Sequence, residues 1–103
     1  MPAKAPQFAL YFEPVFLENY ARLGPKERNA IDKAVKFLAA NPRHSSLNLH
    51  KAKNVRAKYP MGGNDVFIAY ASQNLRLTFE YGPESGMIAL RNCGRHDSCE
   101  RKM

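Results

Sequence analysis

Three stretches of the chain alternate hydrophobic and polar residues, and a period of two predicts β-strands. They are residues 7–12, 66–70 and 75–81, and residues 87–92 are expected to form a further long strand. In residues 75–81, apolar side chains at every second position place Arg76, Thr78 and Glu80 on the opposite face. Arg76 is therefore expected inside a strand, facing away from Leu77.

Between the first two strands, apolar residues recur at helical spacing. Pro14 suits the first position of a helix, and Gly24 is expected to end that helix. Pro25 begins a second helix, which the pair Asn41-Pro42 terminates. The tight joint between Gly24 and Pro25 predicts an antiparallel helical hairpin.

Residues 43–64 have no clean period, although Leu47 and Leu49 alternate with polar residues, so part of the segment can pair as a strand. The order β-α-α-β-β-β predicts an α+β fold, with the helical hairpin packed on one face of a mostly antiparallel sheet. A chain of 103 residues is expected to form one domain, spanning residues 1–103. The other face of the sheet would carry Arg76 and receive the basic segment that precedes it.

The net charge of the chain limits the kinds of partner that it is expected to bind. The formal net charge is +7, and the segment between Asp32 and Asp65 holds seven bases and no acid. Nucleic acid, an acidic protein or an anionic membrane would suit this balance, and a solubilising basic surface is the plain alternative. No apolar run approaches about 18 residues, which disfavours a membrane. The chain has two cysteines and no disulfide framework typical of a secreted protein, which favours the reducing cytoplasm.

Several basic residues could act on a phosphodiester. Arg76, held on a strand, can bind phosphate with two donors; a cross-strand ion pair with Glu80 or a solvated side chain is the structural alternative. His50 can move a proton beside Lys51 and Lys53, although a histidine in a basic segment is often structural or exposed. Further phosphate-binding candidates are Arg56 and Arg95.

RNA cleavage needs a base for the 2′-hydroxyl, stabilisation of the phosphorane and an acid for the leaving 5′-oxygen. It needs no metal and no cofactor. In the sequence Gly94-Arg95-His96-Asp97, Asp97 could accept a hydrogen bond from His96. His44, in an Asn-Pro-Arg-His turn, is expected to hydrogen-bond the local backbone. Cys99 with His96 is at most half of a metal site.

Four segments in order resemble the RelE/ParE superfamily of bacterial toxins from type II toxin–antitoxin systems. They are FEPVF (12–16), NPRHSSLNLHK (41–51), NLRLTF (74–79) and LRNCGRHD (90–97). The C-terminal G-x-HD pattern is most similar to the RelE/YafQ-like endoribonucleases, which cut mRNA on the ribosome.

This resemblance assigns roles position by position. Arg76 matches the strand arginine that acts on the scissile phosphate, and His96, followed by Asp97, matches a histidine used in acid–base work. His50, Lys51 and Lys53 match a basic segment that supplies catalytic or phosphate-binding groups. Where the subgroup commonly has a base-stacking aromatic residue three positions after the aspartate, this chain has Glu100.

The resemblance implies a cytoplasmic mRNA interferase, a hydrolase that inhibits translation. Its partners would be a cognate antitoxin in a possible hetero-oligomer, the ribosome and mRNA, with no membrane. Two alternatives stay open: a ParE-like, non-enzymatic inhibitor of DNA gyrase, and an RNA-binding module of the same fold that does not cleave. Gly94-Arg95-His96-Asp97 favours cleavage, whereas Glu100 slightly favours the alternatives.

Overall fold

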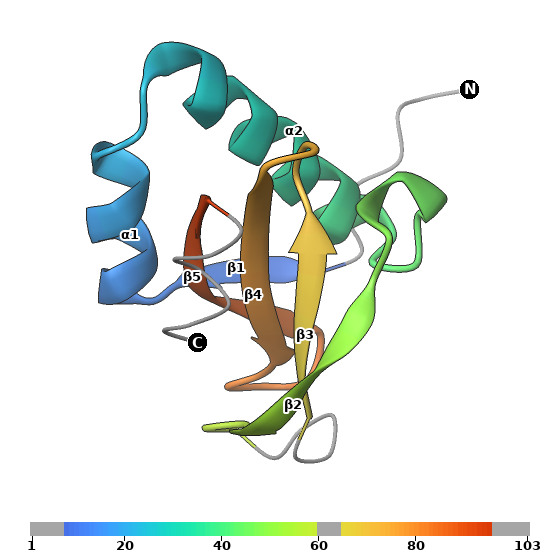
Figure 1. Cartoon of the computed structure of the whole chain (residues 1–103). Coiled ribbons are helices and arrows are strands. Elements are labelled where there is room, and N and C mark those ends of the chain that lie inside the picture. The colour runs from blue at the N-terminus through green and yellow to red at the C-terminus, as the bar shows by residue number, and fades with distance from the viewer. Residues whose placement is uncertain (1–7, 60–64, 96–103) are drawn as a thin grey trace.

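The computed structural model describes residues 8–59 and 65–95, apart from the side chains of Lys53 and Asn54. The elements, in order, are β1 (Ala9–Phe12), α1 (Pro14–Ala21), α2 (Pro25–Ala40), the 3-10 helix η1 (Ser45–Leu47), β2 (His50–Arg56), β3 (Asp65–Tyr70), β4 (Leu75–Tyr81) and β5 (Met87–Arg95). The sheet order is β1-β5-β4-β3-β2. Only the β1–β5 pair is parallel among these five strands. The predicted α+β class, with helices on a mostly antiparallel sheet, is confirmed (Figure 1).

Strand β2 is an addition to the expected order, because it lies in the segment that lacks a clean period. Its pairing with β3 is antiparallel but shifts register between Lys51 and Arg56. Such an irregularity interrupts the alternation of side chains along the strand, which agrees with the lack of a clean period in this segment. The result is a fifth strand at the edge of the sheet, carrying His50 as its first residue.

The helices begin where the prolines predict. Pro14 and Pro25 stand in the first turns of α1 and α2. However, α1 ends at Ala21, and Gly24 is the N-cap of α2 rather than the end of α1. The φ of Gly24 is −73°, which is outside the left-handed region of a helix-terminating glycine, and its N–H donates to Glu27 at 3.1 Å.

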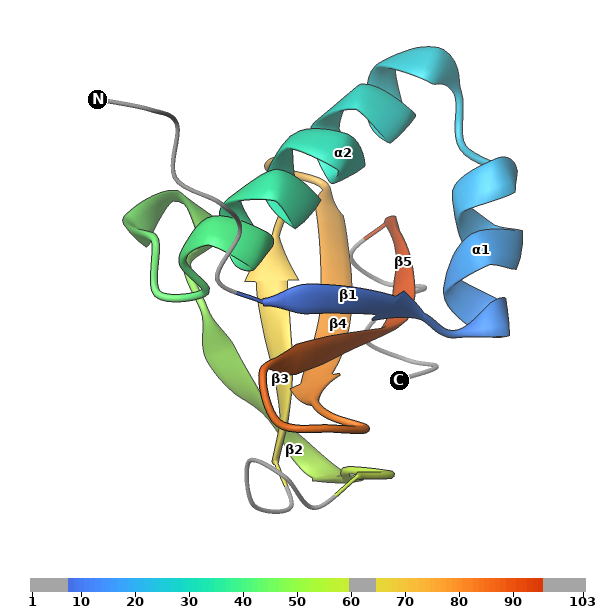
Figure 2. The same ribbon diagram turned by 180° about the vertical axis from the view of Figure 1, so that it is seen from behind.

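The hydrophobic core lies between the helices and one face of the sheet. Figure 2, with β1 and both helices toward the viewer, shows this side. Phe16 of α1 and Leu38 of α2 pack in one cluster with Leu77 and Phe79 of β4, all at most 2% exposed. The predicted alternation in β4 is confirmed by contacts on its two faces. Leu75, Leu77 and Phe79 join this core, whereas Arg76 contacts Tyr70 and Glu80 binds Arg91 and the backbone N–H of Lys58. No helix in the described ranges is long and apolar enough to cross a membrane.

Candidate functional site

Arg76 is buried, with 6% of its surface exposed. Its Nη1 donates to the carbonyl oxygens of Ser72 at 2.9 Å, Gln73 at 3.1 Å and Leu75 at 3.1 Å. These carbonyls belong to the turn between β3 and β4, so the guanidinium holds the turn that begins its own strand. Arg76 is therefore neither solvated nor paired with Glu80, which instead binds Arg91.

Tyr70 lies directly beside Arg76, because the two residues are register partners across β3 and β4. The guanidinium carbon of Arg76 is 3.5 Å from the centroid of the Tyr70 ring, a close cation–π contact. The Tyr70 ring also meets the His50 ring edge-on, with 5.7 Å between centroids. His50, Tyr70 and Arg76 thus form a line across three neighbouring strands, which we call the arginine–tyrosine–histidine cluster.

His50 is the exposed end of this cluster. Its Nδ1 lies 3.3 Å from the carbonyl oxygen of Asn48. A carbonyl only accepts hydrogen bonds, so Nδ1 is the donor in this contact, and in the neutral imidazole the lone pair is then on Nε2. A neutral imidazole with an available Nε2 lone pair is suited to act as a general base.

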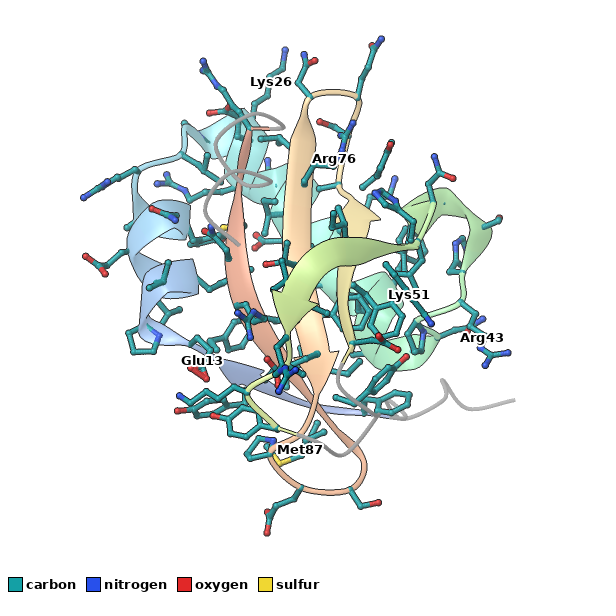
Figure 3. The ribbon with its side chains drawn as sticks, turned by 60° about the horizontal axis from the view of Figure 1, so that its bottom comes forward. Glu13, Lys26, Arg43, Lys51, Arg76 and Met87 are labelled. Carbon is teal, nitrogen blue, oxygen red and sulfur yellow. The ribbon has the colours of Figure 1, made fainter. Side chains whose placement is uncertain are left out.

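Two predicted phosphate ligands lie elsewhere. Lys51 pairs with Phe67 of β3, on the opposite face of β2 from His50, and forms an ion pair with Asp65 at 3.3 Å. Lys51 and Arg76 are well separated in Figure 3. Arg95, the last residue of β5, is an ion-pair partner of Glu27 near the start of α2, at 3.4 Å. Both side chains are largely exposed and contribute long-range positive charge rather than direct contacts with the cluster.

Arg56, at the end of β2, lies in a different environment. It is exposed and lines a cavity of about 340 Å³ together with Glu13, Lys58, Glu80 and Arg91. Two carboxylates and three cations therefore surround this cavity. Arg56 is available to bind phosphate electrostatically, but the two carboxylates reduce the positive potential around it.

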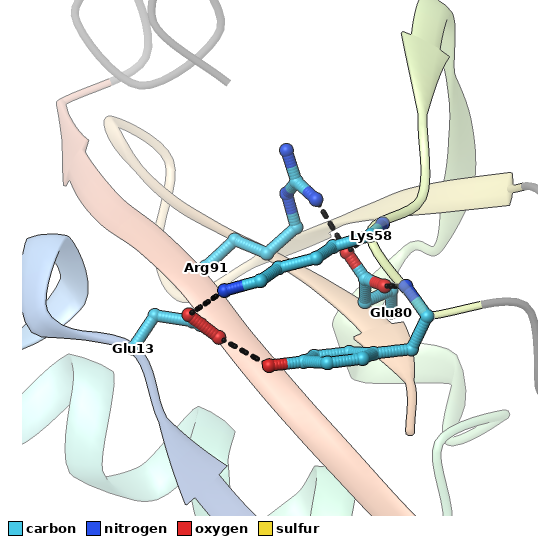
Figure 4. A network of polar contacts seen from close by, with 5 residues as sticks. Glu13, Lys58, Glu80 and Arg91 are labelled. Carbon is cyan, nitrogen blue, oxygen red and sulfur yellow. Dashed lines mark hydrogen bonds and ion pairs between the residues drawn. The ribbon is translucent and has the colours of Figure 1, made fainter. Parts of the chain in front are cut away.

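A network of polar contacts fixes the segment that follows β2 (Figure 4). Glu80, 1% exposed, accepts hydrogen bonds from the backbone N–H groups of Lys58 and Tyr59 and forms an ion pair with Arg91. Glu13 accepts from the Tyr59 hydroxyl at 3.0 Å and pairs with Lys58 at 3.5 Å. Burial, with the hydrogen bond to Glu13, raises the pKa of Tyr59. As expected, the basic segment reaches the face of β4 that carries Arg76 and Glu80.

Tyr59 is also fixed by packing. An added Cβ at Gly82 would lie only 2.5 Å from the Cβ of Tyr59, and Gly82 has a φ of +137°. Close approach and backbone conformation both therefore favour glycine at this position. Together with the carboxylate contacts, this packing anchors the segment to the end of β4.

Some predicted residues lie outside the described part of the chain. These are His96, Asp97, Cys99 and Glu100, together with the side chain of Lys53. Within the described ranges, no group of three or more His, Cys, Asp or Glu side chains is placed to hold a metal ion. Among the described candidates from the sequence, His50 and Arg76 are brought together through a shared neighbour, the ring of Tyr70.

Sequence reasoning overlooked Tyr70 as part of the site. A signal was present, because the three-residue loop 72–74 pairs Ala71 with Leu75 and hence Tyr70 with Arg76. The network of Glu13, Tyr59 and Glu80 had no such signal, because its members come from distant parts of the chain. The expectation for His44 is confirmed, since its Nδ1 accepts from the backbone N–H of Ser46 at 3.2 Å.

The sequence matches no protein-family profile and no curated protein sequence. Its fold, however, is similar to several solved structures. A chain of the archaeal RelE–RelB complex from Pyrococcus horikoshii has a TM-score of 0.65 at 9% identity, covering 86% of this chain and 94% of that chain. YafQ from E. coli has a TM-score of 0.61 at 12% identity, covering 89% and 97% respectively. A YoeB/ParE toxin from Agrobacterium tumefaciens has a TM-score of 0.63 at 11% identity, covering 86% and 99%.

The chain therefore has the fold of these solved RelE, YafQ and YoeB/ParE chains, over nearly their whole length. The resemblance inferred from four short sequence segments is confirmed at the level of fold.

Proposed function

We propose that the protein is the toxin of a type II toxin–antitoxin system and acts as a ribosome-dependent, metal-independent endoribonuclease. The observation that carries this proposal is the arginine–tyrosine–histidine cluster, which joins a fixed positive charge to a histidine with an available lone pair. The basic charge of the domain and its RelE-like fold support the same reading. Such an enzyme would work in the cytoplasm, where ribosomes are.

In the proposed reaction, Nε2 of His50 removes the proton from the 2′-hydroxyl, and the 2′-oxygen attacks the adjacent phosphorus. Arg76 stabilises the negative charge that develops on the phosphorane. The turn carbonyls and Tyr70 hold Arg76 in advance, so little reorganisation is needed during the reaction. His96, supported by Asp97, is proposed to protonate the leaving 5′-oxygen. The products are a 2′,3′-cyclic phosphate and a 5′-hydroxyl.

The remaining basic residues are proposed to attract and guide RNA. Arg56 would contact phosphate beside the cavity at the end of β2, while Lys51, Lys53 and Arg95 would add long-range attraction. The exposed ion pairs of Lys51 and Arg95 are compatible with this role, because such pairs are weak and easily exchanged in water.

Cleavage of a defined mRNA on purified ribosomes tests the proposal. We expect cutting when an mRNA is translated, poor cutting of naked RNA, and continued activity when EDTA is added with Mg²⁺ replenished for the ribosome. The end groups of the products should be a 2′,3′-cyclic phosphate and a 5′-hydroxyl. Strong cutting of naked RNA that stops when a trace transition metal is removed would overturn the proposed mechanism.

One observation favours an RNA-binding module that does not cleave. The Nη1 of Arg76 already contacts three carbonyls, and the residue is only 6% exposed, which limits direct access to a phosphate. In that case the protein would bind RNA or programmed ribosomes without producing new RNA ends. The same ribosome assay separates the two functions, because binding and cleavage are measured in one sample.

A cognate antitoxin is the proposed partner. RelB and DinJ are the partners in complexes whose toxin chains share this fold. Besides its basic charge, the protein exposes apolar side chains around β1 and α1, at Tyr11, Phe12, Val15 and Leu17. An acidic, amphipathic antitoxin segment would bury apolar surface and cover the candidate site. Its association rate should fall as salt rises, with dissociation less affected, and an association rate indifferent to salt would contradict electrostatic steering.

A further inference from the structure

A second pocket lies beside the cluster, between α2, η1 and the end of β3, and has a volume of about 220 Å³. Lys33 and Phe37 of α2 line one side, and His44 and Ser46 line another. Tyr70 also lines this pocket, and its ring contacts Arg76 and His50, so one residue belongs to both the pocket and the cluster. The pocket therefore adjoins the candidate site.

The charge of the pocket is positive. No acidic residue belongs to its lining, and Lys33, an exposed residue, makes no ion pair within the described part of the chain. The neighbouring Asp32 lines a different pocket and accepts a hydrogen bond from Tyr20 at 2.6 Å. Since no described carboxylate competes for Lys33, an anion entering the pocket would meet an uncompensated ammonium group.

His44 is expected to donate a hydrogen bond from its Nε2 atom. Its Nδ1 accepts from the backbone N–H of Ser46 at 3.2 Å and lies 2.7 Å from the Ser46 hydroxyl. Because a backbone N–H only donates, Nδ1 is unprotonated and the imidazole proton is on Nε2. The ring stacks on Phe37, with 4.3 Å between centroids, which restricts its orientation. His44 is thus the complement of His50, whose proton is on Nδ1.

We propose that this pocket binds a backbone phosphate of the nucleotide next to the one positioned at His50 and Arg76. Lys33 supplies charge, and the Nε2–H of His44 supplies a hydrogen bond. This assignment rests on the proposed RNA-directed function but names a binding site separate from the reacting groups. A single-stranded RNA chain would then pass Tyr70, with one phosphate on each side of this residue.

A matched pair of lysines tests the assignment. Lys33→Gln and Lys36→Gln each remove one exposed positive charge from α2, but only Lys33 lines this pocket. Binding of a short single-stranded RNA with 2′-O-methyl groups, which block cleavage, is measured by fluorescence anisotropy over a salt series. Lys33→Gln should weaken binding several-fold and reduce the slope of log K against log salt by about 0.7, whereas Lys36→Gln should change it much less. Equal effects of the two substitutions would overturn the assignment of this pocket as a phosphate-binding site.

His44 gives a second readout that does not depend on cleavage. Titration of the intact protein with inorganic phosphate should shift the His44 ring resonances in NMR, and Lys33→Gln should weaken this response. If phosphate shifts His44 but the RNA affinities of the two lysine variants are equal, the site binds a free anion only and the proposal is wrong. If Lys33→Gln selectively weakens RNA binding while the wild type cuts no mRNA on ribosomes, the pocket stands and the endoribonuclease proposal fails.

Discussion

The guanidinium of Arg76 stacks on the ring of Tyr70 at 3.5 Å, and the strand register enforces this contact. Stacking covers one face of a delocalised cation, while the turn carbonyls of residues 72–75 bind its Nη1. The arginine is therefore fixed in position before any substrate arrives. Its charge also lies in a partly desolvated environment, where electrostatic interactions are stronger than in water.

Substitutions of Tyr70 distinguish the contribution of its ring from that of its hydroxyl. Tyr70→Phe keeps the stacking surface and should retain most cleavage, whereas Tyr70→Leu removes the ring that contacts both Arg76 and His50. We expect Tyr70→Leu to lower the free energy of unfolding by about 0.5–2 kcal/mol and to reduce ribosome-dependent cleavage. Urea unfolding and cleavage rates measure the two effects. Equal activity of the two folded variants would show that the ring does not position the cluster.

Substitution of Arg76 should affect stability as well as activity. In Arg76→Ala three buried or partly buried carbonyl contacts are lost, so we expect the free energy of unfolding to fall by about 1–3 kcal/mol. Cleavage should fall about 10²–10³-fold in protein that circular dichroism shows to be folded. Arg76→Lys should rescue only partly, because lysine lacks the planar fork. Full toxicity of folded Arg76→Ala would remove Arg76 from the mechanism.

Glu80 should contribute more to the free energy of unfolding than the exposed Glu84. Glu80→Ala removes the buried acceptor of two backbone N–H groups and one ion-pair partner of Arg91, so we expect a loss of about 1–3 kcal/mol in the free energy of unfolding. Glu84→Ala is a matched control, because Glu84 is an exposed acid in the loop that follows β4. Chemical denaturation measures both variants. Similar stabilities would mean that the network does not hold the segment after β2.

Cys93 should make the fold sensitive to alkali. Burial raises the pKa of its thiol from an ordinary value of 9.0 to about 12. Because the folded-state pKa is raised, the native protein retains this proton while the unfolded chain loses it, so the contribution to stability is complete below pH 9.0 and declines between pH 9.0 and about 12. Unfolding free energies across this range, in a Cys99→Ser background, should fall less steeply for Cys93→Ala. Identical slopes would contradict the linkage.

Local patterns were enough to predict most of the fold. The alternation in β4 placed Arg76, Thr78 and Glu80 away from the helices, and Pro14 and Pro25 marked the starts of both helices. The sequence allowed part of residues 43–64 to pair as a strand but did not place β2 in the element order, because the alternation is interrupted where its register shifts. Pairing with β3, a long-range interaction, stabilises β2 despite its weak local signal.

The candidate site was less predictable, because a site depends on which side chains meet across strands. The sequence indicated His50 and Arg76 and joined Lys51 to Arg76 as a phosphate ligand. In the structure, Lys51 lies on the face of β2 opposite His50 and pairs with Asp65. Tyr70 was seen only as a strand residue, although it connects the two predicted catalytic groups. Contacts of this kind follow from register, and register follows from loop lengths and bulges rather than from composition.

Primer extension on cellular mRNA shortly after induction tests the central claim most directly. The proposed endoribonuclease should produce new 5′ ends within translated regions in minutes. These ends should be absent for folded Arg76→Ala and reduced for Tyr70→Leu. Growth arrest without new mRNA ends, accompanied by gyrase-dependent DNA breaks, would contradict RNA cleavage and support gyrase inhibition instead.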